Sequence, residues 1–151
     1  MPIDIREFRL DDYDNAVALW QRTPNVGLSD ADGRAEIGAF LERNPGMSFV
    51  AVDGNSLVGT ILCGPDGRRG LIHHLVSAPE VRRQGLGRRL LDAGLEGFRL
   101  AGIRKVHFLV FHANQAGIAF WTAVGAQRRS DVNLYSIRVP DEEASKPGRM
   151  P

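Results

Sequence analysis

The sequence predicts an α/β fold of the α+β kind, in which strands and helices share one core. Runs rich in β-branched residues alternate with runs that carry apolar residues at helical spacing. The chain has 151 residues, of which 43% are hydrophobic, and this is enough for one core. A loop with two glycines at 82–87 lies between a predicted buried strand and a predicted helix. We therefore expect a single domain at 1–139 and a disordered polar tail at 140–151.

The chain opens with a predicted strand and two predicted helices. Residues 3–8 alternate between polar and apolar side chains, as a half-buried strand does. Residues 11–20 carry apolar residues at helical spacing behind aspartates that are good helix caps. After a loop, residues 34–43 form a second predicted helix. Asn44-Pro45-Gly46 ends this helix, because proline and glycine are poor residues for continuing one.

Three predicted strands come next. Residues 48–52 and 56–63 are β-rich, and Asp53-Gly54-Asn55 between them is typical of a hairpin turn. A second turn at 64–70 leads to another β-rich run at 71–77. The middle of the chain is therefore predicted to consist of strands and turns.

The last part of the chain returns to mixed structure. Residues 88–100 have leucines and a phenylalanine at helical spacing, and the predicted helix ends at Gly102. Residues 105–111 are β-rich, and residues 114–124 are predicted to form a further helix. Residues 132–139 alternate as a final strand does.

Charge and cysteine content exclude several classes of function. Nineteen Lys and Arg residues against 18 Asp and Glu residues give a formal net charge of +1, so there is no global attraction for nucleic acid or an anionic membrane. The single cysteine, Cys63, cannot form an intramolecular disulfide, and no Cys/His cluster has the spacing of a metal site. No apolar run has the length of a signal peptide or a membrane span. We therefore expect a cytoplasmic protein with no metal, no nucleic-acid partner and no membrane partner.

The loop Arg82-Arg83-Gln84-Gly85-Leu86-Gly87 is suited to bind phosphate. A helix start presents backbone N–H groups that have no partner within the helix, and the helix dipole adds partial positive charge. Gly85 and Gly87 lack the Cβ atoms that would keep an anion from these amides. A nicotinamide dinucleotide fold is disfavoured, because no acidic residue follows about 20 positions onward. A Walker loop is disfavoured too, because Gly-Lys-Ser and Gly-Lys-Thr are absent.

Other short motifs surround this loop. Within the loop, Arg82, Gly85 and Gly87 fit a six-residue pattern. This pattern has Arg or Gln at its first position, Gly at its fourth, and Gly or Ala at its sixth. The motifs around it are Ile5-Arg6, Phe8-Arg9, Asp12, Leu19-Trp20, Leu75-Val76-Ser77-Ala78-Pro79-Glu80, Asn114, Phe120-Trp121 and Gly125. A glycine motif alone recurs by chance, but together these motifs resemble the GNAT superfamily of acetyl-CoA-dependent N-acetyltransferases over nearly the whole chain. The small bacterial YpeA-like members are the most similar.

The resemblance implies a fold and a co-substrate. The fold would be a central, mixed, mostly antiparallel twisted sheet of about six to seven strands with four helices. The strands at 71–77 and 105–111 would splay apart, so that the pantetheine arm of acetyl-CoA pairs with the first while the pyrophosphate lies on the amides of about 83–88. The residues expected to bind acetyl-CoA are Leu75, Val76, Ser77, Arg82, Arg83, Gln84, Gly85, Leu86, Gly87, Arg88, Asn114, Phe120 and Trp121.

The catalytic base is predicted on the strand before the loop, because an amine must lose a proton before it attacks the thioester. Alternation places His73 and His74 on opposite faces of this strand. The resemblance favours His73 as the base, and a structural, partly buried histidine is the alternative. A backbone N–H near Val76 or Ser77 would polarise the thioester carbonyl. The family usually has Val where this chain has Ser77, so its hydroxyl would lie beside the thioester or bond to neighbouring backbone.

The catalytic acid differs from the family pattern. Family members often have Tyr at the position of Trp121, and an indole N–H donates hydrogen bonds without transferring a proton at neutral pH. The thiolate would then leave with hydrogen-bond help only, or Tyr135 or water would supply the proton. Packing with Phe120 is the alternative role for Trp121. Cys63 is predicted to be a buried strand residue rather than a nucleophile.

The acceptor is predicted only as a class. The resemblance implies that residues 23–43 line one side of the acceptor cleft. Asp30, Asp32 and Glu36 would attract a cationic amine there, or would serve as helix caps and surface charge, which we favour. We expect an acetyl transfer to a primary amine of a small molecule or peptide by direct attack in a ternary complex, and we allow for a homodimer. The alternative is a coenzyme A binding module without turnover.

Overall fold

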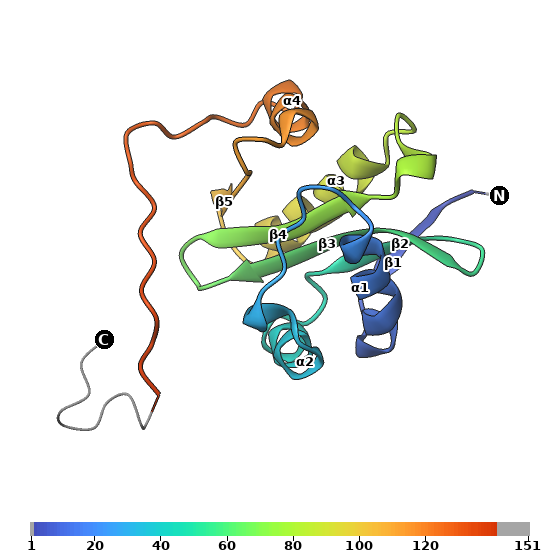
Figure 1. Ribbon diagram of the computed structural model, residues 1–151, viewed down its shortest axis with the longest axis horizontal. Helices are drawn as coiled ribbons and strands as arrows, with labels where there is room; N and C mark the ends of the chain where they lie inside the picture. Colours follow the sequence, from blue (N-terminus) through green and yellow to red (C-terminus); the bar gives the residue numbers. More distant parts are fainter. Residues whose placement is uncertain (1, 142–151) are drawn as a thin grey trace.

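The computed structural model describes residues 2–141, which are built around one twisted sheet (Figure 1). Its strands are β1 (Asp4–Glu7), β2 (Phe49–Asp53), β3 (Ser56–Pro65), β4 (Gly70–Ser77) and β5 (Val106–Phe108). They lie side by side in the order in which they occur in the chain. All neighbouring pairs are antiparallel except β4 and β5, which are parallel. The sheet is therefore mixed and mostly antiparallel, as predicted.

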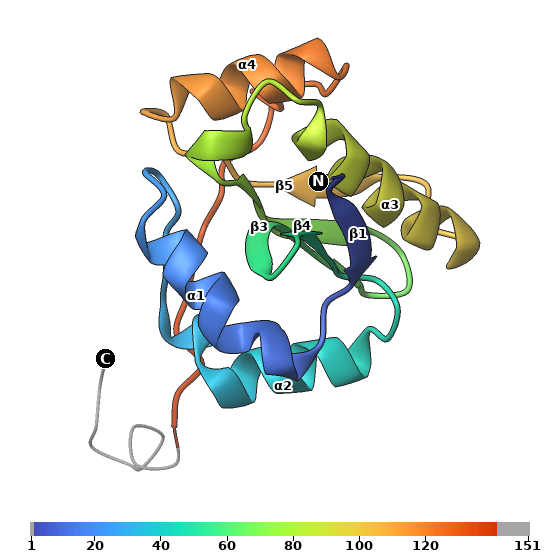
Figure 2. The same cartoon turned by 90° about the vertical axis from the view of Figure 1, so that its right-hand side faces the viewer.

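Residues 2–141 contain four α-helices, as expected. They are α1 (Tyr13–Gln21), α2 (Arg34–Arg43), α3 (Leu86–Leu100) and α4 (Gln115–Ala123). Three short 3₁₀ turns are η1 (Leu10–Asp12), η2 (Asp30–Asp32) and η3 (Pro79–Val81). Figure 2 shows α1 and α2 on one side of the sheet, α3 on the other, and α4 above the sheet. The sheet is thus covered on both faces.

The core is formed by the residues that the helical and strand patterns place inward. The buried side chains of α3 include Leu86, Leu90, Leu91 and Phe98. Gly59 allows α3 to approach the sheet, because a Cβ there would lie 2.9 Å from Leu90. On the opposite face, Trp20 of α1 is buried and its indole N–H donates to the hydroxyl of Thr60 at 2.9 Å. Apolar packing and a satisfied indole therefore fix α1 and α3 on the sheet.

Strands β4 and β5 pair over only three residues, from Gly70 opposite Val106 to Ile72 opposite Phe108. A parallel pair needs a crossover connection, which α3 provides. Beyond Ile72, β4 continues to Ser77, and within residues 2–141 no strand pairs with that part of its edge. The backbone of residues 73–77 is therefore free on the side of β5, which agrees with the expected splay of the two strands.

Two predictions about strands are wrong. The sheet of the described chain has five strands rather than six or seven, and residues 132–139 pair with none of them. These residues follow α4 as an extended trace that leaves the sheet (Figure 1). The predicted strand at 105–111 is also shorter, since β5 ends at Phe108. High β-propensity is not sufficient, because a strand forms only where a neighbour takes up its hydrogen bonds. Of the predicted tail at 140–151, residues 142–151 lie outside the described residues.

Candidate active site

A pocket of about 990 Å³ lies between the end of β4, the start of α3 and the start of α4. The loop after α1 contributes residues 23–27, and the segment after β5 contributes residues 109–112. The predicted site residues that line it are His73, Leu75, Val76, Ser77, Arg82, Arg83, Gly85, Leu86, Gly87, Arg88, Asn114, Phe120 and Trp121. Gln84 belongs to the loop but does not line the pocket. Residues from separate motifs are thus brought together at one place.

The loop before α3 has the backbone shape of an anion site. Gly85 is the N-cap of α3 in the left-handed region at φ +75°, and no side chain caps the helix start. Arg83 is also left-handed, at φ +66°, which is uncommon for a residue with a Cβ. The first helical N–H groups, from Leu86 onward, therefore have no partner within the helix. These amides and the positive end of the helix dipole favour a bound anion.

The start of α4 is held against this loop. The side-chain oxygen of Asn114 accepts a hydrogen bond from the backbone N–H of Gly117 at 2.9 Å, so Asn114 caps α4 as predicted. A Cβ on Gly87 would lie 3.1 Å from the ring of Phe120. Gly87 therefore allows α3 and α4 to pack closely, in addition to leaving its amide accessible.

A bulge in β4 changes the course of the strand at its two histidines. Thr60 of β3 pairs with Val76, whereas Leu62 pairs with His73, so β4 has one more residue than β3 in this interval. His74 lies within it in the left-handed region, at φ +47°. An extra residue in one strand is what defines a bulge, and it re-aims the side chains beside it.

Both histidine rings face the side of the sheet that α1 and α2 cover. The ring centroid of His74 lies 4.5 Å from that of Trp20 in α1. The ring of His73 lies edge-on to Phe40 in α2, with centroids 6.0 Å apart. The prediction that His73 and His74 point to opposite faces is therefore wrong, because alternation holds only for a strand without a bulge.

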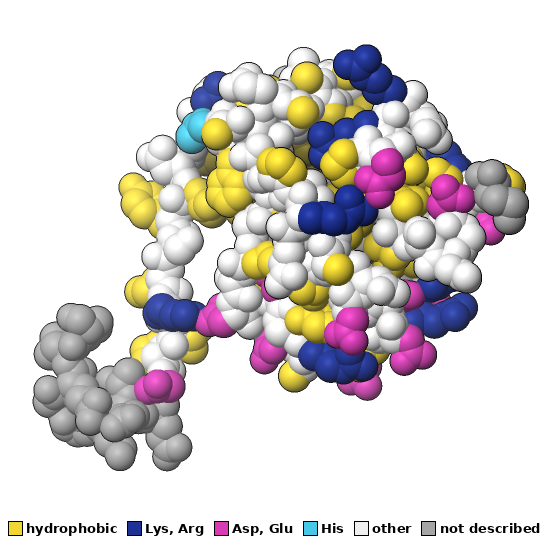
Figure 3. Space-filling view, turned by 45° about the vertical axis from the view of Figure 1, so that its right-hand side comes forward, with side chains coloured by type: hydrophobic (Ala, Val, Ile, Leu, Met, Phe, Trp, Pro, Cys, Tyr) yellow, Lys and Arg dark blue, Asp and Glu magenta, His cyan; other side chains and the backbone are white. Residues whose placement is uncertain are grey.

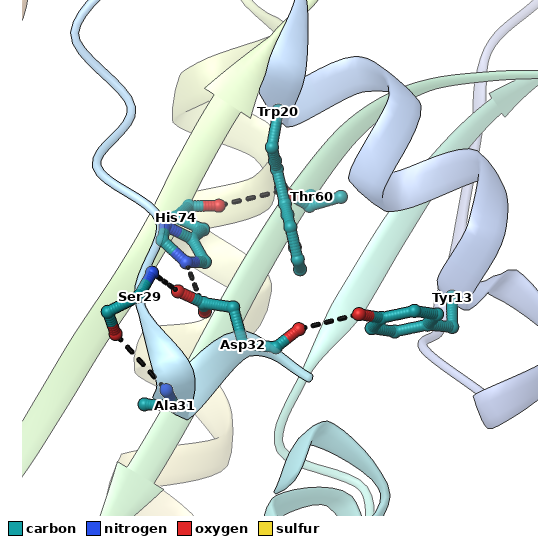
Figure 4. A network of polar contacts seen from close by, with 7 residues as sticks. All are labelled: Tyr13, Trp20, Ser29, Ala31, Asp32, Thr60 and His74. Carbon is teal, nitrogen blue, oxygen red and sulfur yellow. Dashed lines mark hydrogen bonds and ion pairs between the residues drawn. The ribbon is translucent and has the colours of Figure 1, made fainter. Parts of the chain in front are cut away.

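His74 contacts a carboxylate from a distant part of the chain (Figure 4). Its Nε2 lies 2.8 Å from Oδ1 of Asp32 in η2, and the two side chains are only 14% and 13% exposed. The other oxygen of Asp32 accepts from the backbone N–H of Ser29 at 2.9 Å. The backbone carbonyl of Asp32 accepts from the hydroxyl of Tyr13 at 2.7 Å, and that of His74 accepts from Thr60 at 2.7 Å. Asp32 is therefore a fixed, mostly buried charge beside an imidazole that lines the pocket.

Comparison with known proteins identifies the family. The model of the acetyltransferase (GNAT) family matches residues 13–126. The chain belongs to the GNAT family. The acetyltransferase plu1384 of Photorhabdus laumondii subsp. laumondii is 35% identical over 119 residues, which cover 77% of this chain and 80% of that protein. The acetyltransferase ECA0875 of Pectobacterium atrosepticum is 26% identical over 141 residues, which cover 93% of this chain and 99% of that protein.

A solved structure shares the fold. The PaiA N-acetyltransferase of Thermoplasma acidophilum, in complex with coenzyme A, superposes with a TM-score of 0.71 at 18% identity, covering 83% of this chain and 89% of that one. The predicted resemblance to small bacterial GNAT acetyltransferases is confirmed, as are the α+β GNAT fold and its four helices. As a GNAT acetyltransferase, the protein uses acetyl-CoA.

Trp121 lies at the position where the resemblance leads us to expect Tyr. Its ring stacks on Phe108 of β5, with centroids 3.6 Å apart, and meets Phe120 edge-on at 5.2 Å. Trp121 therefore packs α4 against β5 and also lines the pocket. Tyr135, which the sequence offered as an alternative acid, is 86% exposed and does not line the pocket.

His73 is the more exposed of the two histidines in this GNAT pocket. Partial burial lowers its pKa below the usual 6.5, and the neighbouring His74 lowers it further. The charge of Asp32 acts in the opposite direction, but it does not outweigh the other two effects. His73 is therefore neutral at pH 7 and able to accept a proton.

One further candidate group, the thiol of Cys63, is excluded from the chemistry by its surroundings. Cys63 is fully buried in β3, and burial raises the pKa of its thiol to about 12, so it is a core residue as predicted. Residues 2–141 contain no group of three or more His, Cys, Asp or Glu side chains placed to hold a metal ion. No helix among these residues has the length and apolar character to cross a membrane.

The contact between His74 and Asp32 is the part of the site that the sequence did not reveal. The spacing of Ser29 and Asp32 is that of a reciprocal cap, and Asp32 does cap η2. This signal identifies Asp32 as a fixed side chain. It does not place the carboxylate beside His74, because that contact depends on the β4 bulge and on the path of the loop after α1.

Proposed function

We propose that this protein transfers the acetyl group of acetyl-CoA to a primary amine by direct attack in a ternary complex. One observation carries the proposal: the free helix start at Gly85 and the imidazole pair of the β4 bulge line the same pocket. An anion site that holds the donor and a group that accepts a proton are the two requirements of this reaction.

The donor would lie along the loop and the free edge of β4. Its pyrophosphate would contact the amides at the start of α3, with Arg82, Arg83 and Arg88 adding charge-assisted contacts. Its pantetheine arm would pair with the unpaired backbone of residues 73–77. A backbone N–H near Val76 or Ser77 would then stabilise the oxyanion of the tetrahedral intermediate.

The proton would be accepted by His74, with Asp32 beside it. One ring nitrogen of His74 contacts the carboxylate, which leaves the other to take a proton from the acceptor ammonium. The nearby charge of Asp32 stabilises the imidazolium that results, and the contact holds the ring in one orientation. The sequence-based candidates His73 and Ser77 line the same pocket, but His73 has an aromatic neighbour where His74 has a carboxylate.

The reaction would proceed in one addition and one elimination. The neutral amine attacks the thioester carbonyl, and a C–N bond forms. The intermediate then collapses: its nitrogen gives up its remaining extra proton to a water molecule, the C–S bond breaks, and the thiolate of coenzyme A leaves. Trp121 provides no proton, so water would pass the proton released by the nitrogen to the thiolate.

Donor binding tests the anion site. Calorimetry with acetyl-CoA should show micromolar-class binding to the wild type and none to Gly85→Glu, because Glu adds both volume and negative charge at the loop. Gly54→Glu is the matched control. Gly54 has φ +62° in the β2–β3 turn and, like Gly85, has open space around it, so both variants carry the same backbone strain. Unchanged binding to Gly85→Glu would refute the loop assignment.

Turnover of acetyl-CoA tests whether a primary amine is the acceptor. Free thiol released from acetyl-CoA should increase in the presence of some member of a panel of primary amines that includes amino-acid amides, polyamines, aminoglycosides and peptides. Binding of acetyl-CoA without turnover on the whole panel would instead support a coenzyme A binding module.

A further inference from the structure

A single buried hydroxyl connects helix α1 to the bulge of β4. The side chain of Thr60, on β3, accepts a hydrogen bond from the indole N–H of Trp20 at 2.9 Å and donates one to the backbone carbonyl of His74 at 2.7 Å (Figure 4). Thr60 is fully buried, and Trp20 is 1% exposed. A hydroxyl has one proton to donate, and here it goes to the residue that carries the proposed base.

The carbonyl that Thr60 holds belongs to the residue at which β4 leaves the regular register. Leu62 pairs with His73 and Thr60 pairs with Val76, and His74 lies between them in the left-handed region at φ +47°. A residue with a Cβ adopts this region at an energetic cost, so the surrounding contacts have to hold it there. The hydroxyl of Thr60 supplies such a contact from the neighbouring strand.

Water does not replace this contact. Figure 3 shows charged side chains of both signs on one face of the molecule, where water surrounds them. Thr60 lies below the surface, so loss of its hydroxyl would leave the Trp20 N–H unpaired in the core and remove the contact on the His74 carbonyl. A buried polar group without a partner destabilises the arrangement that buries it. The bulge would therefore relax toward another backbone path.

The ring of His74 is held from two further sides. The ring centroid of Trp20 lies 4.5 Å away, and Oδ1 of Asp32 lies 2.8 Å from Nε2. A carboxylate only accepts hydrogen bonds, so Nε2 carries the proton and Nδ1 keeps its lone pair. The direction of that lone pair depends on the backbone from which the ring extends, and this is the backbone that Thr60 holds.

We propose that Thr60 is a positioning residue for acetyl transfer: its hydroxyl fixes the β4 bulge, so that the imidazole of His74 stays on Asp32 and presents Nδ1 to the acceptor amine. The inference rests on the proposed function of His74 as the base. Thr60 does not line the pocket, so it touches no substrate and acts through His74.

Kinetics of two variants at this hydroxyl test the role. Thr60→Val removes the hydroxyl from a side chain of similar shape and should lower kcat about tenfold, because a displaced base loses its geometry, while the KM for acetyl-CoA stays within about twofold. Thr60→Ser keeps the hydroxyl and should retain kcat within about twofold. The assay uses the amine that gives the highest turnover in the panel above.

Ser48→Ala is the matched control. The hydroxyl of Ser48 is also buried, and it accepts from the backbone N–H of Cys63 at 3.0 Å, outside the bulge. This variant loses a buried hydrogen bond and some stability, but its kcat should not change. If Thr60→Val does not fold, Thr60→Cys takes its place, because a thiol is a weak donor of similar size, and its loss of kcat should be smaller.

Nitrogen-15 NMR of the imidazole tests the hold of Thr60 without any turnover. At alkaline pH, where imidazoles are neutral, the wild type and Ser48→Ala should show His74 with its proton on Nε2 only, and Thr60→Val should show both tautomers. Unchanged His74 signals in Thr60→Val, or full kcat in this variant when His74→Ala is impaired, would overturn the inference. Full kcat in both Thr60→Val and His74→Ala would instead refute His74 as the base.

Discussion

The imidazole of His74 on β4 and the carboxylate of Asp32 in η2, 42 residues apart in the chain, lie in contact at 2.8 Å. This contact joins the strand proposed to hold the thioester to η2, which follows the pocket-lining residues 23–27 in the chain. It fixes the orientation of the imidazole by a buried, directional interaction.

We expect His74→Ala to lower kcat about 100- to 1,000-fold, since loss of a general base typically costs this much. Asp32→Asn should lower kcat by about 10-fold, because the ring stays in place but loses the charge that stabilises its protonated form. The KM for acetyl-CoA should change little in both, since neither residue lies at the phosphate loop. Steady-state kinetics across pH 6–9 measure this.

His73→Ala is the comparison for this assignment. We expect it to lose less than about tenfold in kcat, because its ring contacts the ring of Phe40, whereas that of His74 contacts the carboxylate. If His73→Ala loses more activity than His74→Ala, the sequence-based choice of His73 as the base is right, and the proposal that His74 is the base is wrong.

The pKa of His73 should lie below 6.5 and should respond to its two neighbours in opposite directions. Asp32→Asn removes a negative charge and should lower the pKa of His73 further, whereas His74→Ala removes the neighbouring ring that lowers this pKa and should raise it. NMR titration of the ring carbons measures both shifts. Because the folded protein then binds the His73 proton less readily than the unfolded chain does, the free energy of unfolding should decrease as pH falls below 6.5. A His73 pKa above 6.5 in the wild type would contradict the expected desolvation.

Asp12 should contribute to stability in a pH-dependent manner. Burial raises its pKa, but the bidentate contact with Arg6 at 2.8 Å and the backbone N–H of Arg9 outweigh burial, so the pKa lies below 3.8. The stabilisation by Asp12 is therefore complete above pH 3.8 and is lost as pH falls through the lower pKa that Asp12 has in the folded protein. Asp12→Asn should reduce the free energy of unfolding at pH 7 by about 2 kcal/mol, and the difference should shrink in acid.

Urea unfolding at pH 7 and at pH 3 measures this effect. Glu96→Gln is the control, because Glu96 pairs with Arg99 on the exposed surface of α3 and such pairs contribute little. Equal losses for the two variants at pH 7 would contradict the role of Asp12.

Cys63 should be inert in the folded protein. Its thiol is buried and has a pKa of about 12, so iodoacetamide at pH 8 should label it only after denaturation. Cys63→Ala should keep its turnover, because the residue does not line the pocket. Mass spectrometry before and after denaturation checks the first point. Rapid labelling of the native protein, or loss of turnover in a fully folded Cys63→Ala variant, would contradict this expectation and make Cys63 a candidate nucleophile.

Most elements were predictable where local chemistry decides them. The helix predicted at 34–43 matches α2, because Asn44-Pro45-Gly46 ends it and its apolar spacing is helical. The hairpin of β2 and β3 follows from Asp53-Gly54-Asn55, with Gly54 at φ +62°. The start of α3 was also predictable, since the glycines of the loop at 82–87 are a local signal before a helix, and Gly85 is its N-cap at φ +75°.

Two features were not predictable, for one physical reason. The alternation rule placed His73 and His74 on opposite faces, but the bulge that turns both rings to one side exists only because β3 and β4 pair with a shifted register. The strand expected at 132–139 has suitable residues but no partner in the described chain. Both depend on a neighbouring strand, and strand pairing is non-local.

The sequence by itself determined the family, the donor and the loop that would hold it, because these rest on contiguous residues and on a helix start. Only the tertiary structure decided which histidine meets a carboxylate and where the sheet lacks a strand. Those relations join residues far apart in the chain, and they arise from register, packing and the path of loops rather than from local propensity.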